Sequence, residues 1–336
     1  MARVPQILVV GSFVMDMITC TNCVPAEGET VFGYDFRMAP GGKGANQAVQ
    51  AARLGSHVTM VGKVGDDMFG HWLLDSSVQA GVNVQEVKLD RDVPSAVGNV
   101  IIDHHEQVVQ NRIIVVPGAN MAIGLADVAF LEKEISAFDM VILQLEIPLE
   151  INILVARYAK SKGVPVMLNA APSDKLPREL LENITYLSPN EHEFEDLTGV
   201  SVLNRDGLLA EEQMQAASTK LQEMGIPNIL ITLGSRGAAF CGRDEFMICP
   251  AREQVKVKDP TAAGDSFVAA FCTAVCCGAS HRLAVEFANQ VAAITVSRIG
   301  SQTSLPTIAE VVQSWIDVEK DKFKLIYSQL QKEKTA

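Results

Sequence analysis

Residues 259–266, with the sequence Asp-Pro-Thr-Ala-Ala-Gly-Asp-Ser, combine a turn of small side chains with an acid at the start of an apolar helix. The backbone N–H groups of residues 262–265 are expected to lack partners at the positive end of that helix. Small side chains let a phosphate come close to such groups, so the turn is predicted to be an anion hole. The charge of Asp265 would repel a phosphate, so Asp265 is unsuited to bind one. Its position instead favours a role as the general base for a hydroxyl group that attacks the phosphate. The alternative is that Asp265 only caps the helix.

A second glycine-rich segment, residues 40–55, lies far upstream and begins Pro-Gly-Gly-Lys-Gly-Ala-Asn-Gln. Its composition favours a helix over residues 45–54, and Gly55 is placed to end that helix. Glycines let the chain enter a helix with its backbone exposed to a ligand, and Asn46 can exchange hydrogen bonds with a polyol. The spacing differs from that of a P-loop, and a flexible surface turn is the alternative interpretation.

Together the two segments resemble those of the ribokinase-like sugar kinases, and the resemblance covers residues 7 to about 306. Further matches follow in the family's order at Gly11-Ser12 with Asp16, 28–30, 64–67, 117–120, 144–146, 188–193 and 232–237. The resemblance implies a three-layer αβα sandwich with a mainly parallel sheet, a small antiparallel β lid and an ATP-dependent carbohydrate kinase. Residues 1–306 would form the kinase domain, and residues 307–336 a C-terminal helix.

Composition limits the other possibilities. A chain of 336 residues with 48% hydrophobic content can bury a large core in one or two domains. The net charge of −12 argues against a nucleic-acid partner and against an anionic membrane surface. No apolar run approaches the roughly 20 residues of a membrane span. The first apolar run, 7–10, ends too early for a signal peptide and predicts a buried strand, so we expect a cytoplasmic protein.

The seven cysteines are odd in number, and four of them lie within apolar runs, which favours reduced thiols in the core. Cys20 and Cys23 form a Cys-x-x-Cys pair. A zinc site would need a second pair, and a redox motif would need a helix N-terminus here. The flanking residues instead favour a strand, which argues against both roles.

Short apolar runs alternate with helical stretches along the chain, which predicts a parallel sheet with helices on both faces. The strand candidates are residues 7–10, 58–61, 140–143, 164–168, 186–187 and 229–232. Several of the matching motifs come directly after a strand candidate. Because parallel strands end at the same edge of a sheet, these motifs are expected to form one composite site.

Residues 13–38 and 95–116 interrupt the alternation with strand-rich sequence that has no helix between the strands. Such inserted hairpins suggest a small antiparallel lid. By resemblance, the lid covers the sugar and pairs with its twin in a homodimer. His104 and His105 are expected at the solvated tip of the second hairpin rather than in a metal site.

By resemblance, Asp265 takes the proton of the sugar's primary hydroxyl as that hydroxyl attacks the γ-phosphate of ATP. The N–H groups of Ala262, Ala263 and Gly264 would hold the charge that develops on the transferred group. Pro260 and Ala262 depart from the residues common in the family, but both keep the turn small.

A pentose is the expected sugar substrate. The positions that match the family's sugar site are Val14, Asp16, Gly42, Lys43, Gly44, Asn46 and Glu146, together with Asp265. Lys43 is also compatible with a solvated surface position. Val14 stands where many ribose kinases carry Asn, and because valine cannot bond a hydroxyl it suggests 2-deoxyribose as the alternative to ribose.

The resemblance also implies ATP, Mg²⁺ and K⁺. Asn190 and Glu193, three apart on a helical face, would organise Mg²⁺ and phosphate, although they also fit a helix cap. The remaining nucleotide positions are Thr232, Gly234, Ser235, Arg236, Gly237, Gly264 and Asn289. Potassium would bind mostly through backbone oxygens at Asp259, Thr261, Thr295, Arg298, Gly300 and Ser304. Asp259 alternatively caps its turn.

Three functions compete at this point. An ATP-dependent pentose kinase is favoured, with ribose ahead of 2-deoxyribose. A nucleoside or fructose kinase of the same superfamily is the second, and the third is a sugar-binding regulator that has lost its chemistry. The presence of Asp265, Gly264, Asn190 and Glu193 argues against the third. A Rossmann oxidoreductase is disfavoured because no Gly-x-Gly-x-x-Gly follows the first strand.

Overall fold

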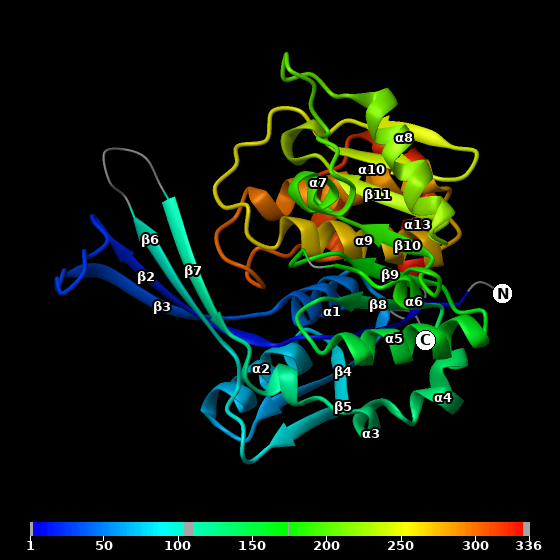
Figure 1. The fold of residues 1–336 in the computed structure, drawn as a ribbon. Coiled ribbons are helices and arrows are strands. Elements are labelled where there is room, and N and C mark those ends of the chain that lie inside the picture. Colours follow the sequence, from blue (N-terminus) through cyan, green and yellow to red (C-terminus); the bar gives the residue numbers. More distant parts are fainter. Residues whose placement is uncertain (1–2, 104–109, 174, 332–336) are drawn as a thin grey trace.

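A nine-stranded sheet lies between two layers of helices, and a smaller four-stranded sheet projects from this body (Figure 1). The computed structural model describes residues 3–103, 110–173 and 175–331. His104 and His105 lie outside these ranges. The two layers and the projecting sheet are the architecture that the sequence predicted.

The central sheet runs in the order β13-β12-β11-β10-β9-β8-β1-β4-β5. Its strands are β1 Gln6–Val10, β4 His57–Gly65, β5 Val82–Asp90, β8 Met140–Gln144, β9 Val166–Asn169, β10 Tyr186–Ser188, β11 Asn228–Thr232, β12 Ala238–Cys241 and β13 Phe246–Cys249. All pairings are parallel from β5 to β11, and the last two are antiparallel. The six predicted strands are confirmed.

Alternation along the strands divides the core in two. In β1, Ile7 and Val9 contribute to one buried cluster while Leu8 and Val10 contribute to the other. The first cluster is covered by helices α1 Lys43–Arg53, α2 Met68–Gln79, α9 Ala263–Cys276, α10 His281–Val296, α11 Ile308–Gln313 and α13 Lys324–Leu330. The second is covered by α3 Leu125–Val128, α4 Leu131–Glu134, α5 Leu149–Ser161, α6 Arg178–Leu181, α7 Glu191–Thr198 and α8 Glu211–Glu223.

Three strands of the central sheet were not predicted. β5 is an edge strand in which Val82 and Val87 are the buried residues, so it lacks a continuous apolar run. β12 and β13 form an antiparallel hairpin with no helix between them, so they depart from the alternation of strands and helices.

The lid is the four-stranded sheet, in the order β3-β2-β6-β7. Its strands are β2 Val14–Thr21, β3 Gly33–Gly41, β6 Val97–Asp103 and β7 Gln110–Val116. The two hairpins are antiparallel as expected, but β2 and β6 pair in parallel. The reason is that β2 follows β1 and β6 follows β5, so both strands leave the body in the same direction (Figure 1).

The chain after residue 306 forms three short helices, α11, α12 (Asp317–Lys322) and α13, where the sequence predicted one helix. Caps mark the starts of the first two helices: Glu310 accepts the N–H of Thr307, and Glu319 accepts that of Ile316. This part packs against the body, because Phe323 lies 5.7 Å from Phe287 between ring centroids.

The seven cysteines are all free thiols, and Cys23 is the exposed one. Among the helices of the described residues, none has the length and apolar character needed to cross a bilayer.

The packing of Phe323 yields a test of how much the C-terminal helices contribute to stability. Phe323→Ala removes a ring that is 1% exposed, so we expect the free energy of unfolding to fall by about 3–5 kcal/mol. Val318→Ala is the matched control, since Val318 is 73% exposed and should change the free energy by less than about 0.5 kcal/mol. Urea unfolding curves would measure both. Equal effects would mean that these helices do not belong to the cooperative core.

Candidate active site

The turn before α9 places its N–H groups at the helix N-terminus, as predicted, with one exception. Ala262 adopts a left-handed conformation with φ of 59° and is the N-cap of the helix. The N–H group of Ala263, predicted to be unpaired, donates to the carbonyl of Pro260 at 3.2 Å. Within the described residues, the N–H groups of Ala262, Gly264 and Asp265 have no hydrogen-bond partner. They are the donors that remain for an anion.

Asp265 is buried at the start of α9, and both of its carboxylate oxygens accept amide hydrogens from α1. The side chain of Asn46 donates to Oδ2 at 2.9 Å, and that of Gln47 donates to Oδ1 at 2.9 Å. Asp265 therefore does not act as a helix cap through its side chain, which was the alternative. The carboxylate is held toward α1 instead.

Opposite charges meet around this carboxylate. Burial raises the pKa of Asp265, while Lys43, Asn46 and Gln47 act to lower it and Glu146 acts to raise it. For Lys43, burial acts to lower the pKa, but the carboxylates of Asp265, Glu146 and Glu193 outweigh it, and its pKa is raised. Lys43 is thus a half-buried cation among three acids rather than a solvated surface lysine.

A cavity of about 210 Å³ lies beside the start of α9. Asn169, Ser188 and Thr232 line it from the ends of β9, β10 and β11, which is the predicted convergence of strand ends. The remaining lining residues are Lys43, Ala171, Asn190, Glu193, Pro260, Ala262, Ala263, Gly264, Asp265 and Val268.

Glu146 is fixed next to the start of α1. Its Oε2 accepts the hydroxyl of Ser12 at 2.5 Å and the N–H of Lys43 at 3.1 Å. The N–H of Gly44 donates in turn to the hydroxyl of Ser12 at 3.2 Å. Gly42 has φ of 93°, and a Cβ there would lie 2.7 Å from the nitrogen of Val14, so only glycine lets the chain turn into the helix this close to β2.

Asp16 lies on β2 between two glycines that give its carboxylate room. A Cβ at Gly41 or at Gly98 would come within 2.5 Å of a carboxylate oxygen of Asp16. Burial, with the charges of Glu146 and Asp265, raises the pKa of Asp16 from 3.8 to about 7. Val14, two residues earlier, is buried at the root of the lid.

Asn190 and Glu193 form the capping box of α7. Oδ1 of Asn190 accepts the N–H of Glu193, and Oε2 of Glu193 accepts the N–H of Asn190, both at 2.8 Å. Burial raises the pKa of Glu193, although Asn190 and Lys43 act to lower it. Because both residues also line the cavity, capping and ligand binding are compatible.

Thr232 and Gly264 line the cavity, whereas the nucleotide positions 234–237 and Asn289 lie outside its lining. Gly234, Ser235 and Arg236 form a short 3-10 turn, η4, and Arg236 pairs with Glu191 at 3.5 Å. A Cβ at Gly237 would lie 2.1 Å from the carbonyl oxygen of Cys249. The side-chain amide of Asn289 donates to the carbonyls of Cys249 and Pro250, so both of its hydrogens are already used.

The two segments predicted to hold a monovalent cation are joined by Asp259. Its carboxylate accepts the N–H of Thr261 at 2.9 Å and the N–H of Gly300 at 2.8 Å. Burial acts to raise the pKa of Asp259, but these hydrogen bonds outweigh it and lower the pKa. The predicted turn-capping role is therefore present. The hydroxyl of Ser304 donates to the carbonyl of Ser301 at 2.7 Å.

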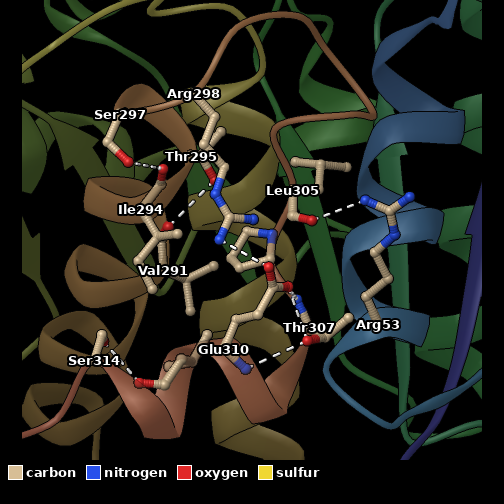
Figure 2. Close-up of polar contacts among 12 residues, drawn as sticks. Arg53, Val291, Ile294, Thr295, Ser297, Arg298, Leu305, Thr307, Glu310 and Ser314 are labelled. Carbon is tan, nitrogen blue, oxygen red and sulfur yellow. Dashed lines mark hydrogen bonds and ion pairs between the residues drawn. The ribbon is translucent and has the colours of Figure 1, made fainter.

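Two arginines hold the chain around this segment (Figure 2). The guanidinium group of Arg298 donates to the carboxylate of Glu310 on α11 at 2.8 Å. The backbone N–H of Arg298 donates to the carbonyl of Thr295 at 3.1 Å. Arg53, at the end of α1, donates to the carbonyl of Leu305 at 2.8 Å. The loop that follows α10 is therefore anchored both to α1 and to the C-terminal helices.

The segments that begin at Gln144 and Asn169 were expected at the composite site, but the sequence assigned no individual role to Gln47, Gln144 or Asn169. The three form a buried amide cluster that meets Asp265 through Gln47. The available signal was amide residues next to Asn46 and at the ends of two apolar strands. Only Gln47 contacts the carboxylate, and Gln144 and Asn169 contact Gln47, an arrangement that depends on the tertiary fold.

Known proteins resemble this chain over most of its length. The pfkB family of carbohydrate kinases matches residues 4–308. The ribokinase of Schizosaccharomyces pombe is 37% identical, covering 91% of this chain and 96% of its own. The deoxyribokinase of Salmonella typhi is 33% identical, with 91% and 97% covered. The solved structure of Arabidopsis thaliana ribokinase complexed with ribose and ATP has a TM-score of 0.83 at 33% identity, covering 92% of this chain and 98% of that one.

The raised pKa of Asp16 predicts a pH dependence of stability. In the folded protein Asp16 keeps its proton up to about pH 7, whereas the unfolded chain releases it from about pH 4. The contribution of Asp16 to the free energy of unfolding therefore falls as pH rises from about 4 toward about 7. Asp16→Asn removes this loss. We expect the variant to gain stability over the native protein between about pH 5 and pH 8, on the order of a few kcal/mol. Urea unfolding at both pH values would measure it. A stability difference that is the same at both would contradict the raised pKa.

Proposed function

The chain belongs to the pfkB family of carbohydrate kinases, and we propose that it transfers the γ-phosphoryl group of ATP to the primary 5-hydroxyl of D-ribose. The observation that carries this proposal is Asp265, a buried carboxylate held by two amides beside unpartnered N–H groups at a helix N-terminus. A base and an anion site next to each other suit a hydroxyl that attacks a phosphate. The named ribokinases among its relatives support ribose as the sugar.

In the proposed mechanism, Asp265 accepts the proton of the attacking hydroxyl. The N–H groups of Ala262 and Gly264 stabilise the charge on the transferred group, because their orientation is fixed before the reaction. Ala263 would join them only if its N–H left the carbonyl of Pro260. Lys43, which lines the same cavity, supplies positive charge between the acids and the phosphate.

The proposed sugar site lies between the start of α1 and the root of the lid. Asp16, Asn46 and Glu146 offer acceptors and donors from three separate segments, as a ring of hydroxyls requires. Gly42 and Gly44 let the start of α1 pack directly on the backbone of Val14 and Ser12, and Lys43 adds a donor. Asn46 already donates to Asp265, so a sugar bound to Asn46 would be adjacent to the base.

We propose that Mg²⁺ and its waters are organised by Asn190 and Glu193 with the ATP phosphates. The capping box uses one oxygen of each side chain, which leaves the second carboxylate oxygen of Glu193 and the amide nitrogen of Asn190 for this role. A bound Mg²⁺ would neutralise charge on the phosphates. Thr232, the η4 turn with Gly237, and Asn289 would adjoin the rest of the nucleotide.

We propose a K⁺ site between residues 259–261 and the loop after α10. The donor set would be the Asp259 carboxylate with oxygens of Thr261, Thr295, Arg298, Gly300 and Ser304. An oxygen-only set suits a hard cation, and the lowered pKa of Asp259 keeps its carboxylate charged. Because the side chain of Arg298 is engaged with Glu310, its backbone oxygen is the part that would contribute.

One observation favours 2-deoxyribose as a second candidate. Val14 is buried at the root of the lid and cannot bond a 2-hydroxyl. A deoxyribokinase is among the relatives. If 2-deoxyribose is the substrate, Val14 is the prime specificity residue.

The lid is proposed to form a homodimer by pairing with the lid of a second copy. It carries exposed apolar side chains that water does not favour, and β7 is an edge strand. These side chains are Phe32, Tyr34, Phe36, Ile113, Ile114, Val115 and Val116.

The proposed location of the protein is the cytoplasm.

The proposed activity would be tested by ADP release from Mg²⁺-ATP with K⁺, comparing D-ribose, 2-deoxy-D-ribose, D-fructose and adenosine. We expect ribose to be preferred and Asp265→Asn to reduce its turnover by about 100-fold or more, because general bases contribute about that much. Asp317→Asn, at a carboxylate whose side chain is 98% exposed, is the matched control and should leave turnover unchanged.

A preference for 2-deoxyribose would replace the first candidate by the second. Fructose or adenosine turnover would move the chain to another branch of the family. An Asp265→Asn variant as active as the native protein would refute the assigned base, and the absence of turnover with every sugar would favour a regulator.

The lid proposal predicts that Ile114→Lys lowers the mass in solution from two chains to one, because a charge would be buried in the paired lids. Sedimentation equilibrium would measure the mass. Val318→Lys adds the same charge on α12 and should leave a dimer intact. If Ile114→Lys also stays dimeric, the contact lies elsewhere; a monomeric native protein would exclude the dimer.

A further inference from the structure

Gln47 is a fully buried glutamine whose polar groups are all engaged. Its Nε2 donates to Asp265 Oδ1 at 2.9 Å and to Asn169 Oδ1 at 3.2 Å. Its Oε1 accepts the side-chain amide of Gln144 at 2.7 Å. A buried polar side chain with complete partners can adopt one orientation only.

These contacts connect Asp265 to the ends of three strands. Gln144 ends β8 and Asn169 ends β9, and Asn169 Nδ2 donates to the carbonyl of Ser188 at the end of β10 at 3.0 Å. The backbone oxygen of Gln144 accepts the amide of Asn152 at 2.8 Å. The side chain of Gln144 also rests against Gly11, where a Cβ would lie 1.9 Å from its Oε1. The rigid sheet therefore sets the position of the Gln47 amide.

The hydrogen bond from Gln144 favours one orientation of the Gln47 amide. Because Oε1 of Gln47 accepts from Gln144, only its NH₂ group can point at the carboxylate. A donor stabilises the charged form of a buried acid, whereas an amide oxygen in its place would repel it.

We propose that Gln47 is a positioning residue that orients the carboxylate of Asp265 and keeps it ionised for proton transfer, with Gln144 fixing the Gln47 amide. This inference rests on the proposed function, in which Asp265 is the base. It adds a requirement outside the cavity, since neither Gln47 nor Gln144 lines it.

The other charged groups around Asp265 explain why such a donor is needed. Lys43 on α1 favours the ionised form, but Asp16 on β2, Glu146 after β8 and Glu193 on α7 are acids that disfavour it. Lys43 is shared among several of these acids and faces the ligand. The amide of Gln47 donates to Asp265 from outside the cavity lining.

The test is the pH dependence of kcat/KM for the preferred sugar at saturating Mg²⁺-ATP, compared between the native protein and Gln47→Met. Methionine keeps the volume but donates no hydrogen bond. We expect the acidic limb of the kcat/KM profile to shift to higher pH by about one unit in Gln47→Met, because the ionised carboxylate of Asp265 loses one hydrogen bond. Activity should recover in part as pH rises, which a general loss of packing would not produce.

Gln50→Met is the matched control. Gln50 is equally buried on the same helix, but it donates to the carbonyl of Pro306 at 2.9 Å and has no hydrogen bond to Asp265. Its pH profile should keep the native acidic limb even if stability falls. Gln144→Met is a second variant, which leaves Gln47 in place and should shift the limb in the same direction by less.

An unshifted limb in Gln47→Met, or in Gln144→Met if the first variant does not fold, would overturn the inference, as would an equal shift in Gln50→Met. The proposed function fails separately: an active Asp265→Asn variant would remove the base itself, whatever the glutamine variants do.

Discussion

The structure depends on burying one ionised carboxylate where water cannot stabilise it. Asp265 lies at the start of α9, and burial raises its pKa, which favours the neutral form that could not serve as the proposed base. Two amides of α1 and the charge of Lys43 oppose that effect. The contact between α1 and α9 is therefore both part of the hydrophobic core and the condition for the proposed chemistry.

The acids around Lys43 are not equivalent, because each is held differently. Glu146 accepts two hydrogen bonds near the start of α1, and Glu193 is fixed by the cap of α7. Asp16 lies between glycines of the lid strands, and burial raises its pKa to about 7, so its anion is poorly stabilised. A ligand that donates hydrogen bonds to Asp16 would relieve this cost, and such a ligand would link the proposed sugar site to the root of the lid.

Much of the fold follows from local patterns. The six apolar runs became strands, and the glycine-rich segment became the entry to α1. The parallel pairing of β2 with β6 and the three-helix C-terminus did not follow, because pairing partners and helix breaks depend on where the body directs each segment. The prediction that the N–H of Ala263 is unpaired was wrong for a similar reason. The turn brings the carbonyl of Pro260 within hydrogen-bond distance of that N–H.

The sequence by itself determined the acid, the small residues of its turn and the identity of the family, since these are properties of residues adjacent in the chain. Tertiary structure decided how the acid is held. Asn46 and Gln47 lie 219 and 218 residues from Asp265 along the chain, and only the packing of α1 on α9 brings them to its two oxygens. The charge state of a buried group depends on its neighbours in space, and those are set by the fold.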